Sequence, residues 1–301
     1  MSLNDQIQEV IHQSGATIGV GLHHIESGEE IMINADQYFP LASVVKVPIL
    51  VEACFQMANH QFTPDERWVL KTAEKNLPSG ILTFLEDGLT PTVKDLLTLM
   101  TIISDNTATD IVLKCVGKEA VQQRMRQLGL NHIHIRMTIR ELFEEIYPDA
   151  DPTQDLYELE IRARERGKNK TSRVYQSNPE NNVGTPRELA ALFCKIYKGE
   201  TPDRYWSDFA LNILLQQQLD ERLPRFLPPG TRRAHKTGTL SGIRNDSGII
   251  YAGEDSHVII SVFVLWDEEA VKEDPKASWE RLFALDSAMG EIGLLAYEAY
   301  K

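Results

Sequence analysis

Ser43 and Lys46 form a pair in which a lysine could activate a serine for nucleophilic attack. If a helix begins at Ser43, the two residues lie one turn apart on the same face, with Cβ atoms roughly 5–6 Å apart. A hydroxyl becomes a nucleophile when a base removes its proton, and an amine serves as that base only in its neutral form. The neighbours Val44, Val45 and Val47 are apolar, and desolvation lowers the pKa of a lysine. A pair of this kind has the chemistry that acyl transfer through an activated serine requires, but the pattern alone does not predict that function.

Two further polar motifs follow this pair along the chain. Ser104-Asp105-Asn106 begins 61 residues after Ser43, and Lys236-Thr237-Gly238 begins 132 residues after Ser104. Taken singly, each motif has an ordinary structural explanation as a helix cap or a turn. One S-x-x-K pattern is expected about once by chance in a chain of this length, whereas each tripeptide is expected on the order of a tenth of a time or less. Their joint occurrence therefore favours a catalytic explanation.

In this order, the three motifs resemble those of class A β-lactamases and penicillin-binding proteins. The flanking residues 39–42 (FPLA) and 107–109 (TAT) are also similar to that family, and the resemblance covers the chain except roughly residues 130–184. It implies a β-lactamase/DD-peptidase-like fold and a serine hydrolase that opens a cyclic amide, with a β-lactam as the expected substrate. Two alternatives remain open: a protein that β-lactams acylate without efficient turnover, and a D-alanyl-D-alanine-type peptidase or esterase on the same scaffold.

The resemblance also implies a catalytic role for several motif residues. Ser43 is the expected nucleophile, and Lys46 is the lysine beside it. The backbone N–H groups of Ser43 and Thr239 are expected to form the oxyanion hole, because such donors stabilise the charge that develops on the carbonyl oxygen. Ser104 is expected to relay a proton to the leaving nitrogen.

The remaining motif residues are expected to bind the substrate. Asn106 would hydrogen-bond the substrate amide, and Lys236 and Thr237 would hold the substrate carboxylate. The fold would bring Lys236 close to Lys46, and a like charge nearby lowers the pKa of a lysine further. His235, directly before Lys236, could tune the site electrostatically.

The chain departs from the class A pattern between Gly129 and Thr185, where no E-x-x-L-N segment occurs. In that family the glutamate of this segment positions the water that hydrolyses the acyl-enzyme. Glu141 is the nearest candidate for this role, and the alternative is a glutamate on a helix surface. A second departure follows Lys-Thr-Gly: Arg244 stands several residues before the carboxylate-binding arginine of the family, and Ser247 occupies the matching place.

The hydrophobic pattern predicts α/β structure with α+β layering. Strands are expected at 16–25, 30–34, 231–238, 246–252 and 257–265, and helices at about 4–13, 43–58, 93–103, 105–116, 118–128, 186–198 and 276–299. The middle of the chain is expected to be almost entirely helical. Because strands lie near both chain ends, we expect one five-stranded antiparallel sheet flanked by terminal helices, plus an inserted all-helical subdomain.

These elements are expected to form one β-lactamase-like unit over residues 1–301. Residues 1–42 and 230–301 would form a sheet subdomain. Residues 43–229 would form a mainly helical subdomain, in which 130–184 is atypical.

The composition is typical of a soluble globular protein, with 42% hydrophobic and 25% charged residues. A net charge of −13 disfavours nucleic acid and anionic membranes as partners. No apolar run is long enough for a transmembrane helix, and the N-terminus lacks a signal-peptide pattern. The protein is therefore expected to be cytoplasmic, or secreted with its signal peptide absent from this sequence. Cys54, Cys115 and Cys194 are interpreted as small hydrophobic residues and not as a disulfide framework.

No sequence pattern indicates a metal or a cofactor. There is no H-E-x-x-H and no paired C-x-x-C, and His132 and His134 lack a third ligand, so they are expected at the surface. Residues 154–173 contain six Lys and Arg residues, which we interpret as a solvated helix end and loop. The expected partner is a small-molecule substrate.

Overall fold

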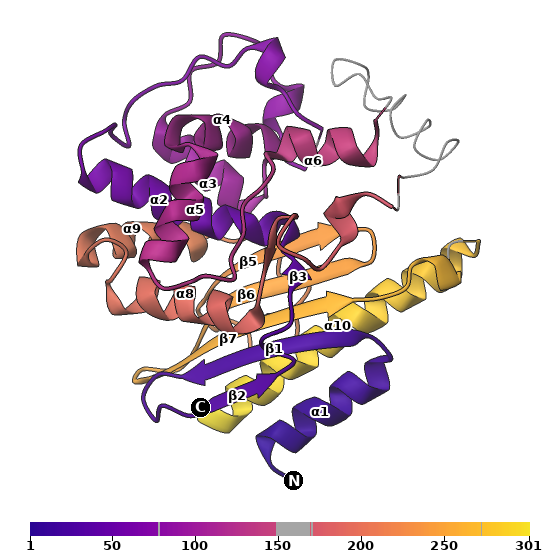
Figure 1. Ribbon diagram of the computed structural model, residues 1–301. Coiled ribbons are helices and arrows are strands. Elements are labelled where there is room, and N and C mark those ends of the chain that lie inside the picture. Colours follow the sequence, from indigo (N-terminus) through magenta and orange to yellow (C-terminus); the bar gives the residue numbers. More distant parts are fainter. Residues whose placement is uncertain (78, 149–168, 170, 272) are drawn as a thin grey trace.

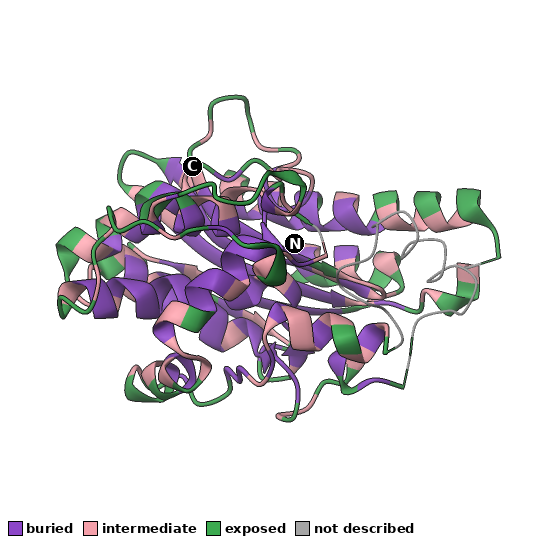
Figure 2. Cartoon of the chain, turned by 90° about the horizontal axis from the view of Figure 1, so that it is seen from above, coloured by how far each residue is buried: buried purple, intermediate pink, exposed green. Residues whose placement is uncertain are grey.

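The computed structural model describes residues 1–77, 79–148, 169, 171–271 and 273–301. Figure 1 shows a central sheet with two terminal helices on one face and a helical layer on the other. In the view of Figure 2, buried residues concentrate in the interior strands and helices, and exposed residues concentrate in the loops. The predicted α+β layering is confirmed.

Five strands form the central sheet. They are β1 (Thr17–His24), β2 (Glu30–Ile33), β5 (Arg233–Leu240), β6 (Ile243–Gly253) and β7 (Ser256–Leu265). Their order is β2-β1-β7-β6-β5, and all neighbouring strands are antiparallel. The predicted sheet is confirmed. Because β5 lies at an edge, one side of its backbone is available to a ligand.

Strand β7, in the centre of the sheet, is apolar on both faces. Successive side chains of a strand point to opposite faces. Val258, Ile260 and Val262 pack in the cluster that contains the terminal helices, whereas Ile259 and Phe263 pack in the cluster of the helical layer. All five are completely buried, and each such side chain stabilises the fold by about 1.5–3 kcal/mol.

The two terminal helices are α1 (Leu3–Ser14) and α10 (Pro275–Tyr300), close to the predicted ranges. Ser2 and Asp5 form a capping box at the start of α1, and the Asp274 side chain caps α10. These caps satisfy N–H groups that have no partner inside the helix. The two helices lie side by side on the sheet (Figure 1).

The helical layer covers the other face. Its α-helices are α2 (Lys46–Ala58), α3 (Val93–Ile102), α4 (Asn106–Val116), α5 (Lys118–Gln127), α6 (Ile139–Ile146), α8 (Pro186–Lys198) and α9 (Arg204–Leu214). Capping side chains of Thr92 and Thr185 begin α3 and α8, as the sequence indicates. Helices α6 and α9 are additions to the predicted set.

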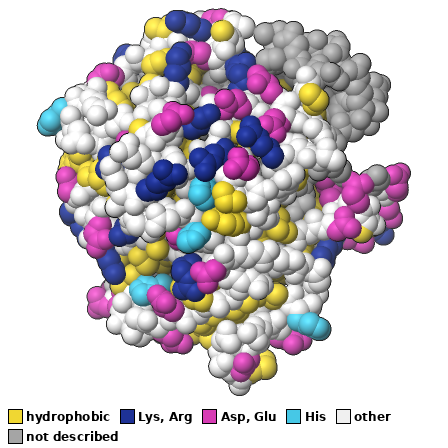
Figure 3. Space-filling view, in the orientation of Figure 1, with side chains coloured by type: hydrophobic (Ala, Val, Ile, Leu, Met, Phe, Trp, Pro, Cys, Tyr) yellow, Lys and Arg dark blue, Asp and Glu magenta, His cyan; other side chains and the backbone are white. Residues whose placement is uncertain are grey.

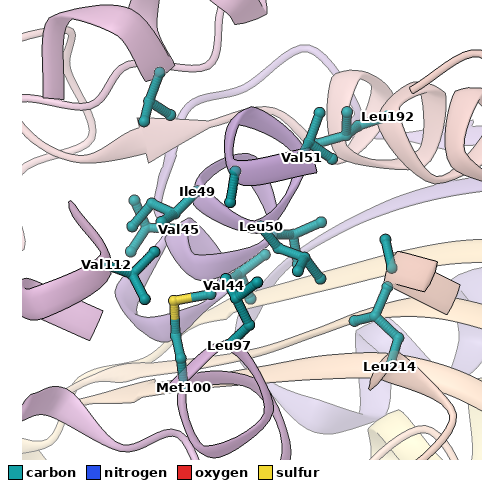
Figure 4. Packing of buried hydrophobic residues seen from close by; sticks show 14 of the residues in the cluster. Val44, Val45, Ile49, Leu50, Val51, Leu97, Met100, Val112, Leu192 and Leu214 are labelled. Atoms are coloured by element: carbon teal, nitrogen blue, oxygen red, sulfur yellow. The ribbon is translucent and has the colours of Figure 1, made fainter. Parts of the chain in front are cut away.

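Helix α2 lies in the middle of this layer, preceded by the 3-10 helix η1 (Ala42–Val45). Figure 4 shows Val44, Ile49 and Leu50 among side chains from α3, α4 and α9, such as Met100 and Leu214. All of these side chains are buried. The packing therefore holds the residues at the start of α2 in one place.

The expectation of an almost entirely helical middle is wrong in two regions. Between Asn59 and Thr92, the described residues form no α-helix; they form the short 3-10 helices η2 (Thr72–Glu74) and η3 (Leu82–Phe84) and an isolated β-bridge between Arg67 and Thr92. Helix-breaking residues such as Gly80 and Gly88, both with positive φ, interrupt this segment. In addition, β4 (Val183–Gly184) pairs with β3 (Phe39–Pro40) in a small second sheet.

Some sequence expectations fall outside these findings. The stretch 154–173 lies mostly outside the described residues; its last residue, Arg173, begins the 3-10 helix η4 (Arg173–Tyr175). The boundaries of the two subdomains stay a prediction.

The three cysteines are free, with Cys54 buried and the other two half-buried. None of the helices in the described parts of the chain combines the length and apolar composition needed to cross a bilayer.

Candidate active site

Ser43 lies at the edge of a cavity between the helical layer and strand β5. The cavity measures about 240 Å³. Its lining residues are Ala42, Ser43, Ser79, Ser104, Asn106, Ile139, Leu142, Phe143, Leu219, Thr237, Thr239 and Leu240. Five of the seven predicted site residues are therefore in its wall, and Lys46 and Lys236 lie directly behind it, as their contacts with Ser104 show.

The backbone around Ser43 differs in detail from the expected helix start. Ser43 belongs to the 3-10 helix η1, and α2 begins only at Lys46. Ala42 has a φ of 47°, a left-handed conformation that is uncommon for a residue with a side chain. Lys46 nevertheless follows Ser43 by one turn, and its backbone N–H donates to the Ser43 carbonyl.

Gly238 permits the close approach of β5 to the Ser43 turn. A Cβ atom at this position would lie 2.6 Å from the backbone oxygen of Leu41 and 3.1 Å from the Val44 side chain. The glycine of the Lys-Thr-Gly motif is thus a packing requirement. It allows β5 and η1 to form adjacent walls of one cavity.

The side-chain nitrogen of Lys46 contacts the second motif. Its Nζ donates to the Ser104 carbonyl oxygen at 2.8 Å, to Ser104 Oγ at 3.0 Å and to Asn106 Oδ1 at 2.9 Å. Ser104 has a φ of 59°, and this left-handed conformation brings both of its oxygens to the same lysine. Strained backbone of this kind concentrates at functional sites.

Lys236 approaches the same serine from the opposite wall. Its Nζ lies 3.2 Å from Ser104 Oγ and donates to the Thr237 carbonyl oxygen at 2.8 Å. The Ser104 hydroxyl therefore connects Lys46 and Lys236, which lie 190 residues apart in the sequence. This three-residue contact unites all three sequence motifs.

Burial changes the protonation of both lysines. Desolvation lowers the pKa of Lys46 well below its usual value, and the neighbouring charge of Lys236 lowers it further. Desolvation also lowers the pKa of Lys236 to about 7, although the Asp246 carboxylate opposes this change.

The two lysines differ from the charged side chains at the surface. On the face shown in Figure 3, Lys and Arg side chains lie interspersed with Asp and Glu, whereas Lys46 and Lys236 are 1% and 0% exposed.

Asp105 fixes the loop beside the cavity. Its carboxylate caps α4 through the Ala108 N–H and accepts hydrogen bonds from the N–H groups of Ile81 and Leu82. The Ser79 hydroxyl donates to the Ser104 carbonyl at 2.6 Å. The central residue of Ser-Asp-Asn is therefore structural, and it holds the loop that places Ser79 in the cavity wall.

Asn106 already has protein partners at both ends of its amide. Oδ1 accepts from Lys46, and Nδ2 donates to the Leu77 carbonyl oxygen at 3.0 Å. An amide nitrogen has two donor hydrogens. The predicted contact with a substrate amide would use the second of these.

The sequence analysis missed Arg222, which is 1% exposed. Its guanidinium donates to the carbonyl oxygens of Gly238 and Asn245 and to the hydroxyl of Thr239, and it pairs with Asp286 on α10. Arg222 lies in the loop 215–232 outside any recognisable motif. The carbonyls of Gly238 on β5 and Asn245 on β6 come next to Arg222 only in the folded chain, so no local sequence signal could have identified it.

The third wall of the cavity is apolar. Ile139, Leu142 and Phe143 of α6 line it, and the first turn of α6 is held by Asp110, whose carboxylate accepts the N–H groups of Ile139 and Arg140. No Asp or Glu is among the described residues that line the cavity.

Glu141, the candidate for the deacylating glutamate, does not line this cavity. Its carboxylate forms a capping box with Thr138 and an ion pair with Lys118 at 3.1 Å. Glu141 therefore lies on the surface of α6, which was the second of the two possibilities that the sequence left open.

The remaining candidates lie away from the cavity. Arg244 is 3.7 Å from Asp286, and Ser247 hydrogen-bonds Ser261 on β7. His132 pairs with Glu188, and His134 is buried beside Tyr38, so the expectation of a surface position is wrong for His134. Among the described residues, no group of three or more His, Cys, Asp or Glu side chains could hold a metal ion.

The fold and the site together define the class of protein as the β-lactamase and penicillin-binding type. A beta-lactamase from Sphaerobacter thermophilus matches with a TM-score of 0.77 and 25% identity, over 98% of this chain and 97% of that chain. PBP-A matches with a TM-score of 0.77 and 22% identity, over 99% of this chain and 95% of that chain.

The family model of the beta-lactamase enzyme family matches residues 2–300, and the chain therefore belongs to that family. The beta-lactamase regulatory protein BlaB of Streptomyces cacaoi is 27% identical over 305 residues, which cover 94% of each chain. Beta-lactamase VEB-1 of Pseudomonas aeruginosa is 27% identical over 287 residues, 91% of this chain and 86% of its own.

Proposed function

We propose that the protein is a serine β-lactamase of the class A type that hydrolyses β-lactams through an acyl-enzyme on Ser43. The contact of Ser104 with both lysines is the observation that carries this proposal. In this arrangement the buried amine of Lys46 lies one turn from Ser43, the expected nucleophile, and the Ser104 hydroxyl lies between the two lysine side chains. Relatives with the name beta-lactamase, such as VEB-1 and PER-1 of Pseudomonas aeruginosa, support the substrate class.

The proposal assigns the acylation step to these groups. The neutral amine of Lys46 accepts the proton of the Ser43 hydroxyl as Oγ attacks the β-lactam carbonyl carbon. The backbone N–H groups of Ser43 and Thr239 stabilise the oxyanion. When the carbon–nitrogen bond breaks, Ser104 gives its proton to the ring nitrogen and takes from Lys46 the proton that Lys46 received from Ser43, so that protons balance and Lys46 returns to its neutral form.

Lys236 and Thr237 bind the substrate carboxylate in this proposal. The edge position of β5 leaves its outer backbone side facing the cavity, and the ammonium group of Lys236 lies next to it. A buried cation binds a carboxylate more strongly than an exposed one, because water does not screen the pair. Arg222 supports this site by holding Thr239 and the Gly238 carbonyl.

The proposal is tested by incubation with a chromogenic cephalosporin, followed by intact-mass measurement. We expect steady colour release by the wild type and an adduct that maps to Ser43. Ser43→Ala should abolish both without changing the thermal unfolding temperature, because its side chain only borders the cavity. Colour release by Ser43→Ala at the wild-type rate would refute the proposed nucleophile.

A second candidate function is acylation by β-lactams without efficient turnover. The apolar wall formed by Ile139, Leu142 and Phe143 favours it, because hydrolysis of the acyl-enzyme needs a base for water and no carboxylate is among the described lining residues. Stopped-flow measurement separates the two functions. A burst of one equivalent followed by a much slower phase indicates the binding protein, whereas a linear course without a burst indicates the hydrolase.

A further inference from the structure

His235 is buried between two carboxylates on the face of β5 opposite to Lys236. Its Nδ1 lies 2.9 Å from Asp246 Oδ1, and its Nε2 lies 3.2 Å from Asp220 Oδ1. Ionised carboxylates only accept hydrogen bonds, so both ring nitrogens act as donors and the ring is a cation. We call His235, Asp220 and Asp246 the His235 ion cluster.

The cluster connects three segments of the chain. His235 belongs to β5, Asp246 to β6, and Asp220 to the loop 215–232. Asp246 also accepts the backbone N–H of Leu223 through its second carboxylate oxygen. The loop that carries Arg222 and Leu219 is therefore bound to the sheet directly beneath the Lys-Thr-Gly motif.

Charged groups among the described residues face both sides of β5. Asp220 and Asp246 face His235, and Arg233 pairs with Asp220 on the outer side. Asp246 and Glu221 raise the pKa of Lys236, whereas Arg222 lowers it; burial has the largest effect and lowers it. Lys46 faces Lys236 from α2.

Burial by itself lowers the pKa of His235, but the Asp246 and Asp220 carboxylates raise it to about 9. Asp246 thus interacts with two cations at once. It is 0% exposed, and a buried ion cluster contributes little stability compared with apolar packing of the same volume. The free-energy cost of removing these charges from water is large for a link with a purely structural role.

We propose that the His235 ion cluster is a positioning device for the substrate carboxylate, holding the Lys-Thr-Gly strand and the Arg222 loop in the geometry that binds this group. This inference rests on the proposed function. Asp246 is the central residue of the cluster. Its carboxylate hydrogen-bonds His235 and the backbone of the loop, and its negative charge acts on Lys236. His235, Asp220 and Asp246 act through Lys236, Thr239 and Arg222 and do not touch the substrate.

The test compares a penicillin with its methyl ester, which lacks the carboxylate charge. We expect the wild type to be acylated faster by the acid. Asp246→Asn should lower the second-order acylation rate constant for the acid about tenfold and leave that for the ester within twofold. Acylation by the penicillin acid should decline at high pH, where Lys236 loses its positive charge. In Asp246→Asn this decline should occur at lower pH, because loss of the Asp246 carboxylate lowers the pKa of Lys236 further. A purely structural role would change both substrates equally and leave the pH profile in place.

His257→Gln is the matched control. His257 is also bound to a carboxylate, Glu26 at 2.6 Å, but on β7 and away from the cavity. It should behave as the wild type with both substrates. Should Asp246→Asn fail to fold, Asp220→Asn gives the comparison between acid and ester, because the Asp220 side chain is about 38% exposed and its replacement is milder. Asp220 does not act on the pKa of Lys236, so the pH profile of this variant should stay in place.

The outcomes separate this inference from the proposed function. Absence of any Ser43 adduct in the wild type would overturn the proposed function. A wild type that prefers the acid, together with variants that keep the same preference and the same pH profile, would overturn only the positioning role. Loss of the preference with a shifted pH profile would establish it.

Discussion

Strands β7 and β5 belong to the same sheet and are buried to a similar extent, but their chemistry is opposite. From Val258 to Val264, β7 buries apolar side chains on both faces with one exception, Ser261. From Ala234 to Gly238, β5 buries His235, Lys236 and Thr237. Burial of apolar groups is favourable, whereas each buried charge requires a partner. β7 therefore stabilises the fold, and β5 depends on that stability to hold charged groups in place.

The largest expected effect comes from removing the charge on β5. Lys236→Met should reduce acylation by a carboxylate-bearing β-lactam about 100-fold or more, since truncating one partner of a buried charge pair costs roughly 2–5 kcal/mol. Stability should be unchanged or higher, because the buried ammonium is replaced by an apolar side chain of similar length. Denaturant unfolding and acylation kinetics measure the two effects. A large loss of stability would contradict the contrast between the strands.

The reciprocal change on β7 should have the reciprocal result. Ile260 is 0% exposed and packs against the terminal-helix cluster. Ile260→Ala should lower the free energy of unfolding by about 2–5 kcal/mol and leave the acylation rate constant unchanged well below the unfolding temperature. A selective loss of acylation would show that β7 also positions the site.

A smaller effect distinguishes His235 by its pH dependence. The pKa of His235 is raised from 6.5 to about 9 in the folded protein, so its contribution to stability is fully present below pH 6.5 and is lost as pH rises through 9. His235→Gln should therefore reduce stability by on the order of 1–3 kcal/mol at pH 6 and by much less at pH 10. A pH-independent difference in urea unfolding would refute the ionic interpretation.

The smallest effect is expected at Glu141. Its carboxylate lies on the outer side of α6 in an ion pair with Lys118, and exposed pairs contribute about 0–1 kcal/mol. Glu141→Gln should leave the lifetime of the acyl-enzyme unchanged when it is followed by intact mass. Accumulation of the adduct in this variant would instead assign Glu141 to deacylation.

Local sequence signals predicted most of the elements. Capping residues such as Thr92 and Thr185 begin helices where expected, and the apolar runs became the strands of the predicted sheet. The prediction failed between residues 59 and 92, because loop conformations there depend on distant partners. The hydrogen bonds from Ile81 and Leu82 to Asp105 are an example.

The sequence by itself determined which residue types are available for chemistry and their order along the chain: Ser43, Lys46, Ser104, Asn106 and Lys-Thr-Gly. Only the tertiary structure decided how they meet. The left-handed backbone of Ser104 joins Lys46 to Lys236. The buried Arg222 binds the loop 215–232 to β5, and the buried Asp246 binds the same loop to β6. The sequence could not determine these contacts, because pKa shifts and buried ion pairs depend on the distance between groups and on their burial. Neither quantity is local in sequence.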